Sequence, residues 1–193
     1  MTSFTRRELG AMAALSLGGA LAGCIGDDGD DDPANGTDDG PDEPPEGYEE
    51  PVATWWADST ADIDAAFDLL ESGDAAVENG ELEDAMDEYE DAFRAFQDLV
   101  RAVNAEIEAT DPEDDPEALI DLWILVGDYF FAYVDVAITR YDAVYETVVE
   151  EDPDGGEAYR QESDAHVSDA AAIADELEVI IGGHDGVVIR QLT

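Results

Sequence analysis

The sequence has no lysine, a single cysteine and only two histidines. One cysteine excludes a disulfide within the chain and any zinc site built on several thiolates. The seven basic side chains are all arginines and face 52 aspartates and glutamates, which gives a formal net charge of −45. Because such a charge repels phosphate backbones, we expect no nucleic-acid partner.

The chain also lacks the motifs of common catalytic sites. It has no Gly-x-Ser-x-Gly turn for a nucleophile, no glycine-rich loop for a phosphate, and no cluster of Cys and His with metal-ligand spacing. We therefore predict a non-enzymatic protein without a cofactor.

The stretch TRRELGAMAALSLGGALAGC, residues 5–24, has the three parts of a secretory signal peptide. Arg6 and Arg7 form a basic start, residues 9–22 are apolar, and small residues lead into Cys24. This apolar run of about 14 residues is too short to span a bilayer, which takes about 20. A buried N-terminal helix is the alternative, but three glycines interrupt the run and an acidic tract follows it.

Two motifs in this stretch resemble those of exported lipoproteins. Thr5-Arg6-Arg7-Glu8-Leu9 resembles the twin-arginine export motif, although Leu9 replaces the usual phenylalanine and no lysine follows. Leu21-Ala22-Gly23-Cys24 resembles a lipobox, whose cysteine becomes the first mature residue and carries lipid on its thiol. The resemblance implies removal of residues 1–23, a lipid anchor at Cys24 and a position on the outer face of the cell membrane. One acyl chain binds only marginally, so stable attachment requires a two-chain modification.

The excess of acidic residues resembles the composition of proteins from salt-loving archaea, which favour Asp and Glu and avoid Lys. Charge of this size pushes a compact state apart in dilute buffer. At 1 M salt the Debye length is only about 3 Å, so most of the repulsion is screened. An acidic tail or a calcium-binding tract is the alternative, but the acids run through every predicted helix. We therefore expect a halophilic fold that needs salt.

Residues 24–54 are predicted to form a disordered acidic linker, because Gly and Pro alternate with acids and little can be buried. The linker would hold a helical domain, residues 55–193, away from the membrane. Asn35-Gly36-Thr37 is a sequon for N-glycosylation within it.

Helical periodicity predicts four helices in the domain. The predicted ranges are 59–79, 81–109, 117–150 and 157–181. Ser59 or Thr60 can cap the first helix, and the second has the clearest apolar row, with steps of three and four residues. Short connections favour an all-α fold, an antiparallel four-helix bundle. The strand-like VVIRQL near the end is expected to pack on this bundle as a tail.

The third predicted helix is apolar enough to suggest a membrane span. Its aspartates outweigh its apolar residues on an insertion scale, so we predict a buried central helix instead. Asp121, Asp128, Asp135 and Asp142 fall every seven residues and therefore lie on one side. They form either a solvated stripe, which we favour, or a carboxylate ladder for cations.

One segment, about residues 66–94, resembles the tetratricopeptide repeat, a helical hairpin. The residues at the spacing of that repeat's small and aromatic positions are Gly73, Gly80, Ala85, Tyr89 and Ala92. Leu69 replaces the repeat's large aromatic residue, Gln97 replaces its closing proline, and no further unit continues the pattern. Because members of that family bind peptides or proteins, the resemblance implies a binding surface at Gly73 and Tyr89. The alternative is ordinary helix packing that uses small residues.

Two further pairs of residues are candidate sites. Trp55 and Trp56 are either an exposed platform for a sugar or a membrane interface, or a hydrophobic staple at the start of the first helix. We favour the staple for at least one ring. Glu162 and His166 share a helix face and could supply two metal ligands together with an acid from the third helix. A histidine that faces inward with its hydrogen bonds satisfied is the alternative that we favour.

These patterns leave two functions open. The first is a lipid-anchored, non-enzymatic module that binds a protein or peptide through the repeat-like hairpin. The second is a helical bundle that binds a ligand or a metal near His166.

Overall fold

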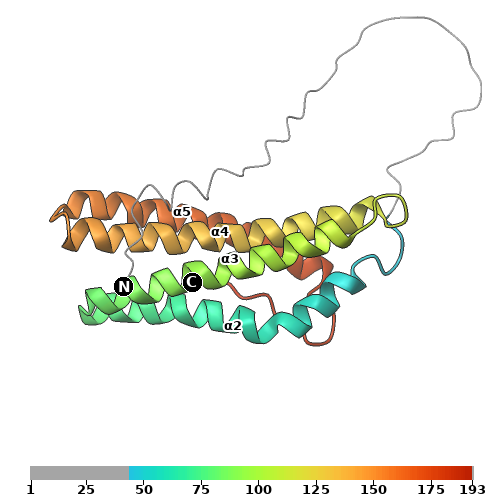
Figure 1. Cartoon of the computed structure of the whole chain (residues 1–193), viewed down its shortest axis with the longest axis horizontal. Coiled ribbons are helices and arrows are strands. Elements are labelled where there is room, and N and C mark those ends of the chain that lie inside the picture. Colours follow the sequence, from blue (N-terminus) through green and yellow to red (C-terminus); the bar gives the residue numbers. More distant parts are fainter. Residues whose placement is uncertain (1–43, 193) are drawn as a thin grey trace, which may run out of the picture. The chain divides into compact units, whose positions relative to one another are not determined.

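The computed structural model of the chain describes residues 44–192. Within this range there are four helices and no strand (Figure 1). They are α2 (Glu50–Asn79), α3 (Leu82–Ala109), α4 (Glu117–Val148) and α5 (Pro153–Ile180). Arg6, Arg7, Cys24 and Asn35 lie outside the described residues, so the export, lipid and glycosylation assignments stay predictions.

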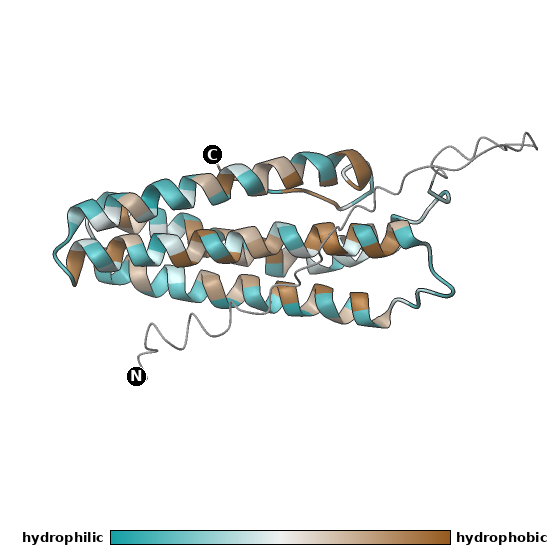
Figure 2. Cartoon of the chain, turned by 90° about the horizontal axis from the view of Figure 1, so that it is seen from above, coloured by the Kyte–Doolittle hydropathy of each residue, from teal (hydrophilic) through white to brown (hydrophobic). Residues whose placement is uncertain are grey.

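The helices alternate in direction and each packs on the next, which confirms the antiparallel four-helix bundle (Figure 1). Figure 2 shows hydrophilic and hydrophobic residues alternating along each helix, as expected for helices that bury one side. Gly80 makes the turn between α2 and α3 with a φ of 78°, which glycine adopts without strain. Among these four helices, no Cα of α2 lies within 8 Å of a Cα of α5, so helix packing leaves one side of the bundle open.

The helix predicted over 81–109 is observed as α3, with nearly the same bounds. Its apolar row begins with the half-buried Leu82 and has six further residues, all of which are buried. They are Ala85, Tyr89, Ala92, Phe96, Leu99 and Val103. Burying one of the larger apolar side chains stabilises a fold by about 1.5–3 kcal/mol, so this row binds α3 firmly to its neighbours.

The first helix begins earlier than predicted. It starts at Glu50, nine residues before Ser59, with a proline in its first turn where a missing N–H costs nothing. Val52 and Trp56 are buried and extend the inward row of the helix toward this start. The last residues of the predicted linker 24–54 are therefore helical, and the boundary predicted at residue 55 is wrong.

The fourth helix also begins earlier than predicted. Pro153 starts it, within the stretch DPDGG that reads as a turn. The side chain of Asp152 caps the helix by accepting a hydrogen bond from the backbone N–H of Gly155, over 3.1 Å. Proline suits the first position of a helix because its fixed φ is already helical. Residues typical of turns here begin a helix.

Helix α4 lies at the centre of the fold. It is the one described helix long and apolar enough to cross a membrane, yet 61% of its apolar window is buried inside the bundle. Tyr129, Phe130 and Tyr133 are fully buried and contact Trp56 and Phe67 of α2. Aromatic pairs of this kind add about 0.5–1.5 kcal/mol beyond their buried area. The burial agrees with the predicted central helix.

Candidate functional site

The residues predicted to form a binding surface hold the α2–α3 hairpin together from inside. A Cβ added at Gly73 would lie 2.5 Å from Cε1 of Tyr89, so the ring packs directly on the backbone of α2. Tyr89 is only 3% exposed, and its hydroxyl donates to Oδ1 of Asp74 over 2.7 Å. The prediction that Gly73 and Tyr89 form a binding surface is therefore wrong, because close helix packing places both inside.

Asp74 connects this hairpin to α4. Its second carboxylate oxygen pairs with Arg140, whose side chain is 18% exposed. Burial, the hydrogen bond to Asp74 and the charge of Asp74 together raise the pKa of Tyr89 well above its ordinary range. The cluster is a brace among three helices.

Trp55 and Trp56 lie in the second turn of α2 and cover one end of the core. Trp56 is fully buried and stacks on Phe130, with ring centroids 5.4 Å apart. Trp55 is half-buried and meets Trp123 edge-on at 5.7 Å. The alternative prediction, that the two rings form an exposed platform, is therefore wrong. The staple is wrong in its position, because the helix begins at Glu50, although the rings do cover the end of the bundle.

Glu162 and His166 lie on α5 near Asp135 of α4. Burial raises the pKa of Asp135, the charge of His166 opposes this rise and the charge of Glu162 adds to it, so the three side chains interact electrostatically. Even so, no three His, Cys, Asp or Glu side chains within residues 44–192 are arranged to hold a metal ion. The geometry does not support the metal alternative. His166 is half-buried and Glu162 is exposed.

Two of the four aspartates of α4, Asp121 and Asp135, lie near residues of α5. Asp121 lines a shallow hollow together with Glu176 of α5. Asp121 and Asp128 are exposed, whereas Asp135 and Asp142 are half-buried. Burial raises the pKa of Asp128 as it does that of Asp135. The stripe is therefore well solvated at one end and partly covered at the other.

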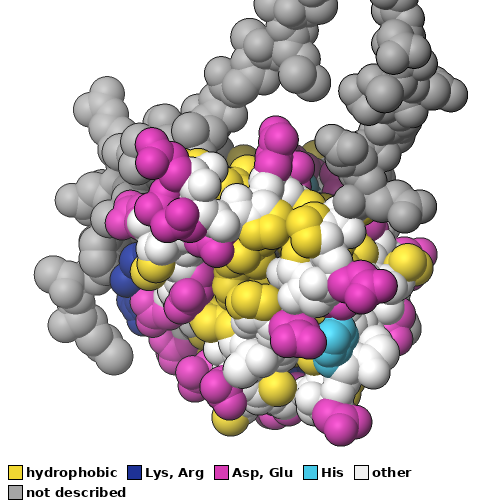
Figure 3. All heavy atoms as spheres, turned by 90° about the vertical axis from the view of Figure 1, so that its right-hand side faces the viewer, with side chains coloured by type: hydrophobic (Ala, Val, Ile, Leu, Met, Phe, Trp, Pro, Cys, Tyr) yellow, Lys and Arg dark blue, Asp and Glu magenta, His cyan; other side chains and the backbone are white. Residues whose placement is uncertain are grey.

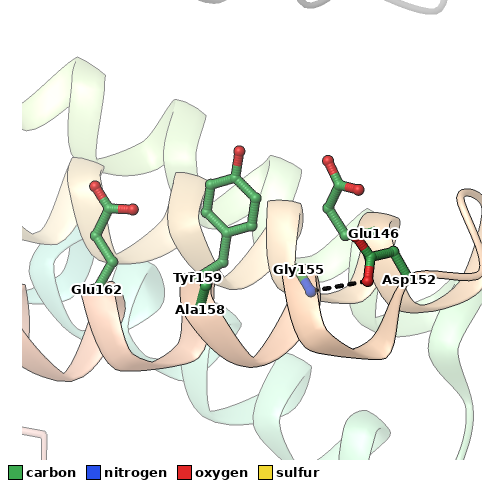
Figure 4. A pocket seen from close by; sticks show the side chains of 6 residues that line it. All are labelled: Glu146, Asp152, Gly155, Ala158, Tyr159 and Glu162. Carbon is green, nitrogen blue, oxygen red and sulfur yellow. Dashed lines mark hydrogen bonds between the residues drawn. The ribbon is translucent and has the colours of Figure 1, made fainter.

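An open hollow of about 360 Å³ lies where α4 ends and α5 begins (Figure 4). Its lining residues are Glu146, Asp152, Gly155, Ala158, Tyr159 and Glu162. Figure 4 shows the polar atoms of Glu146, Tyr159 and Glu162 directed to one side, while Asp152 is engaged by the N–H of Gly155. An open acidic surface of this kind attracts cations in general and selects none.

Hydrophobic side chains gather at the end of the bundle where α2 begins, within a rim of acidic ones (Figure 3). A hollow of about 210 Å³ lies at this end. Its lining residues are Tyr48, Ala118, Asp121, Leu122, Leu125, Glu176 and Ile180. A specific small-molecule site needs polar groups that converge within it, and here the carboxylates stand beside an open apolar surface.

The main feature that the helix pattern does not predict lies after α5. Residues 181–186 turn the chain back, and Val187–Leu192, hereafter the tail, run along the bundle between α2 and α5 (Figure 1). The tail itself has neither helix nor strand structure. The expectation that VVIRQL packs on the bundle is confirmed, and the tail occupies the side that helix packing leaves open.

Three aromatic side chains hold the backbone of the tail. Nε1 of Trp56 donates to the carbonyl oxygen of Val188 over 3.2 Å, and the hydroxyl of Tyr129 donates to the carbonyl oxygen of Arg190. Two residues further on, a backbone N–H donates to the hydroxyl oxygen of Tyr133 over 3.5 Å. Contacts at every second residue are expected for an extended chain, whose structural repeat is two residues.

Arg190 makes the most contacts of any tail side chain. Its guanidinium nitrogens lie 2.7 Å from Glu71, 3.0 Å from Asp68 and 3.4 Å from Asp64, all on α2. The guanidinium also lies 5.1 Å above the ring of Phe67. Burial by itself lowers the pKa of Arg190, and the hydrogen bonds and charges of Asp68 and Glu71 more than offset it, so the pKa is raised.

The surface that contacts the tail, hereafter the tail site, comes from three helices. Its residues are Trp56, Asp64, Phe67, Asp68 and Glu71 of α2, Tyr129 and Tyr133 of α4, and Asp175 of α5. Sequence reasoning missed this site because its contacts join positions up to 132 residues apart. The available signal was an arginine within an apolar segment of a chain that has only seven basic residues.

Comparison with known protein families, curated proteins and solved structures gives no match to this chain. The resemblance of residues 66–94 to a tetratricopeptide repeat therefore stays a prediction.

Proposed function

We propose that this chain is a non-enzymatic interaction module that binds an extended segment of another protein at the tail site. The observation that carries the proposal is the tail itself, a stretch without regular structure that side chains of three helices hold in place. A surface that binds an extended chain within the molecule has the groups to bind one from a partner. The proposal keeps the predicted module and moves its binding surface from the hairpin to the tail site.

The chemistry of the tail site suits such a partner. Trp56, Tyr129 and Tyr133 engage backbone atoms, so their contacts tolerate many sequences. Tryptophan and tyrosine combine a large apolar surface with one polar atom, which is why they are common at protein interfaces. The carboxylates of α2 add selectivity for a cationic side chain.

We further propose that the module works at the outer face of a membrane, attached by lipid on Cys24. The support is the sequence of residues 5–24, with its paired arginines, apolar run and lipobox-like end. The acidic surface of the domain repels anionic headgroups, so attachment would rely on the lipid and not on the domain.

Site-specific photo-crosslinking in membranes at high salt tests the module. A photoreactive residue is placed at Asp175, an exposed position whose carboxylate contacts the tail. The matched control places the photoreactive residue at Asp91 on α3. Asp91 is exposed and pairs with Arg94 of its own helix, not with the tail. We expect adducts with a second protein from position 175 and none from position 91. Equal adducts at both positions, or none at position 175, would overturn the proposal.

A further inference from the structure

Arg190 is used differently from the other arginines that the structure describes. Arg94, Arg101 and Arg160 pair with acids three or four residues away on their own helices. Arg140 braces neighbouring helices through Asp74. Arg190 brings its charge from a segment without regular structure to acids that are at least 119 positions away.

The face of α2 that receives Arg190 is built for a planar cation. Asp64, Asp68 and Glu71 recur at helical spacing, so three carboxylates lie on one face. Like charges in this arrangement repel one another, and a cation between them relieves the repulsion. Phe67 offers its ring to the same group, and a guanidinium can stack on a ring while its fork of N–H groups binds carboxylates.

The tail is held by few contacts compared with the helices. Val187 is its one buried side chain, at 8% exposure, whereas Val188 is 63% exposed. Its connection to α5 contains three glycines, among them Gly186 with a φ of 86°. Segments with little buried apolar surface open locally at low cost, while the rest of the fold stays intact.

We infer that the tail site recognises extended peptides that carry an arginine, and that the tail is the intramolecular copy of this ligand. A partner segment with an arginine flanked by apolar residues would displace the tail and take over its contacts with α2 and α4. This inference rests on the proposed function and specifies the chemistry of its ligand.

Competition by the tail sets the apparent affinity for a free peptide. A ligand joined by a short flexible connection acts at an effective concentration in the millimolar range. The apparent affinity for a free peptide is the intrinsic affinity multiplied by the fraction of molecules whose site is open. Loosening the tail should therefore strengthen binding of a free peptide without any change in the tail site.

Fluorescence anisotropy with a labelled synthetic peptide GVVIRQL tests this inference in the full-length chain, at a salt concentration that supports the complete helical signal. Arg190→Gln removes the guanidinium contacts of the tail and leaves the tail site intact. We expect the variant to bind the peptide at least about tenfold more tightly than the unaltered chain. The control Arg101→Gln, which alters an exposed arginine of α3, should bind like the unaltered chain.

A second peptide, with glutamine in place of arginine, tests the ligand class. It should bind the Arg190→Gln chain at least about tenfold more weakly than GVVIRQL, because glutamine offers neither a charge to the carboxylates of α2 nor a guanidinium to the buried ring of Phe67. The carboxylates are exposed and partly screened by salt, whereas the stacking on Phe67 is not. Equal affinity for the two peptides, or equal affinity of both chains for GVVIRQL, overturns the inference. Gly186→Ala loosens the tail by a second route, since it strains a positive φ and places a Cβ 3.2 Å from that of Ala57.

The outcomes separate this inference from the proposed function. If neither chain binds GVVIRQL while cross-links from Asp175 persist, the ligand class is wrong and the module stands. If cross-links are also missing, both are wrong. Light scattering on the same samples tests whether the tail of a second copy occupies the site. A dimer of the unaltered chain that Arg190→Gln abolishes would assign the site to that tail. This result would overturn the inference of a separate peptide partner.

Discussion

At the scale of single residues, Gly73 sets how closely α2 and α3 approach. Gly73→Ala places a Cβ 2.5 Å from Cε1 of Tyr89, and overpacking of this kind costs about 1–3 kcal/mol. The matched control is Gly127→Ala, whose Cβ would meet only Cγ1 of Val103, at 3.6 Å. That control should gain roughly 0.5–1 kcal/mol from helix propensity. Denaturant unfolding in high salt measures the stability of both variants. Equal unfolding midpoints for Gly73→Ala and Gly127→Ala would contradict close packing of Tyr89 on Gly73.

The same pair of residues shows what a spacing pattern can predict. The recurrence of small and aromatic residues indicates that Gly73 and Tyr89 belong to two closely packed helices, and they do. The pattern does not distinguish the inside of the hairpin from its outside, because both the repeat family and a plain bundle place small residues where helices meet. The assignment of these residues to a binding surface was wrong for that reason.

At the scale of elements, we expect the half-buried Asp135 to lower the stability of the bundle at neutral pH, because its ionised form is disfavoured by burial. Asp135→Asn removes a carboxylate whose ionised form is disfavoured by burial, so the free energy of unfolding at pH 7 should rise. The control Asp121→Asn removes the same formal charge from an exposed position and should raise the free energy of unfolding less.

The pH dependence follows from the raised pKa of Asp135 in the folded chain. Folding favours the protonated form, so this contribution to stability is fully present below the unfolded value of about 3.8 and is lost as the pH rises through the folded pKa. The advantage of Asp135→Asn over the unaltered chain should therefore shrink as the pH falls from 7 toward 4. Urea unfolding at several pH values measures this difference, and a constant advantage would count against it.

The elements also differ in how well their sequences predict them. Helix α3 was predictable because its apolar row runs through most of its length, from Leu82 to Val103. The starts of α2 and α5 were not, because prolines, acids and glycines serve both linkers and first helical turns. The position of the tail depends on side chains such as Trp56 and Tyr129, which local patterns cannot associate with Val188 or Arg190.

At the scale of the whole molecule, we expect charge to govern stability. A formal net charge of −45 on 193 residues produces a self-repulsion that salt must screen. We expect the helical circular dichroism of the domain to fall below roughly 0.5 M salt, where screening weakens. A titration from high to low salt measures this loss, with return to high salt as the test of reversibility. Full helical signal in dilute buffer would refute the halophilic interpretation.

The end of the bundle where α2 begins also determines the intrinsic fluorescence of the protein. All three tryptophans of the chain lie there: Trp55 and Trp123 meet edge-on, and Trp56 donates its indole N–H to the tail at Val188. An indole that exchanges a protein partner for water emits at a longer wavelength. The intrinsic fluorescence of the chain therefore changes as the tail leaves or returns, which makes the occupancy of the tail site an optical signal that requires no dye.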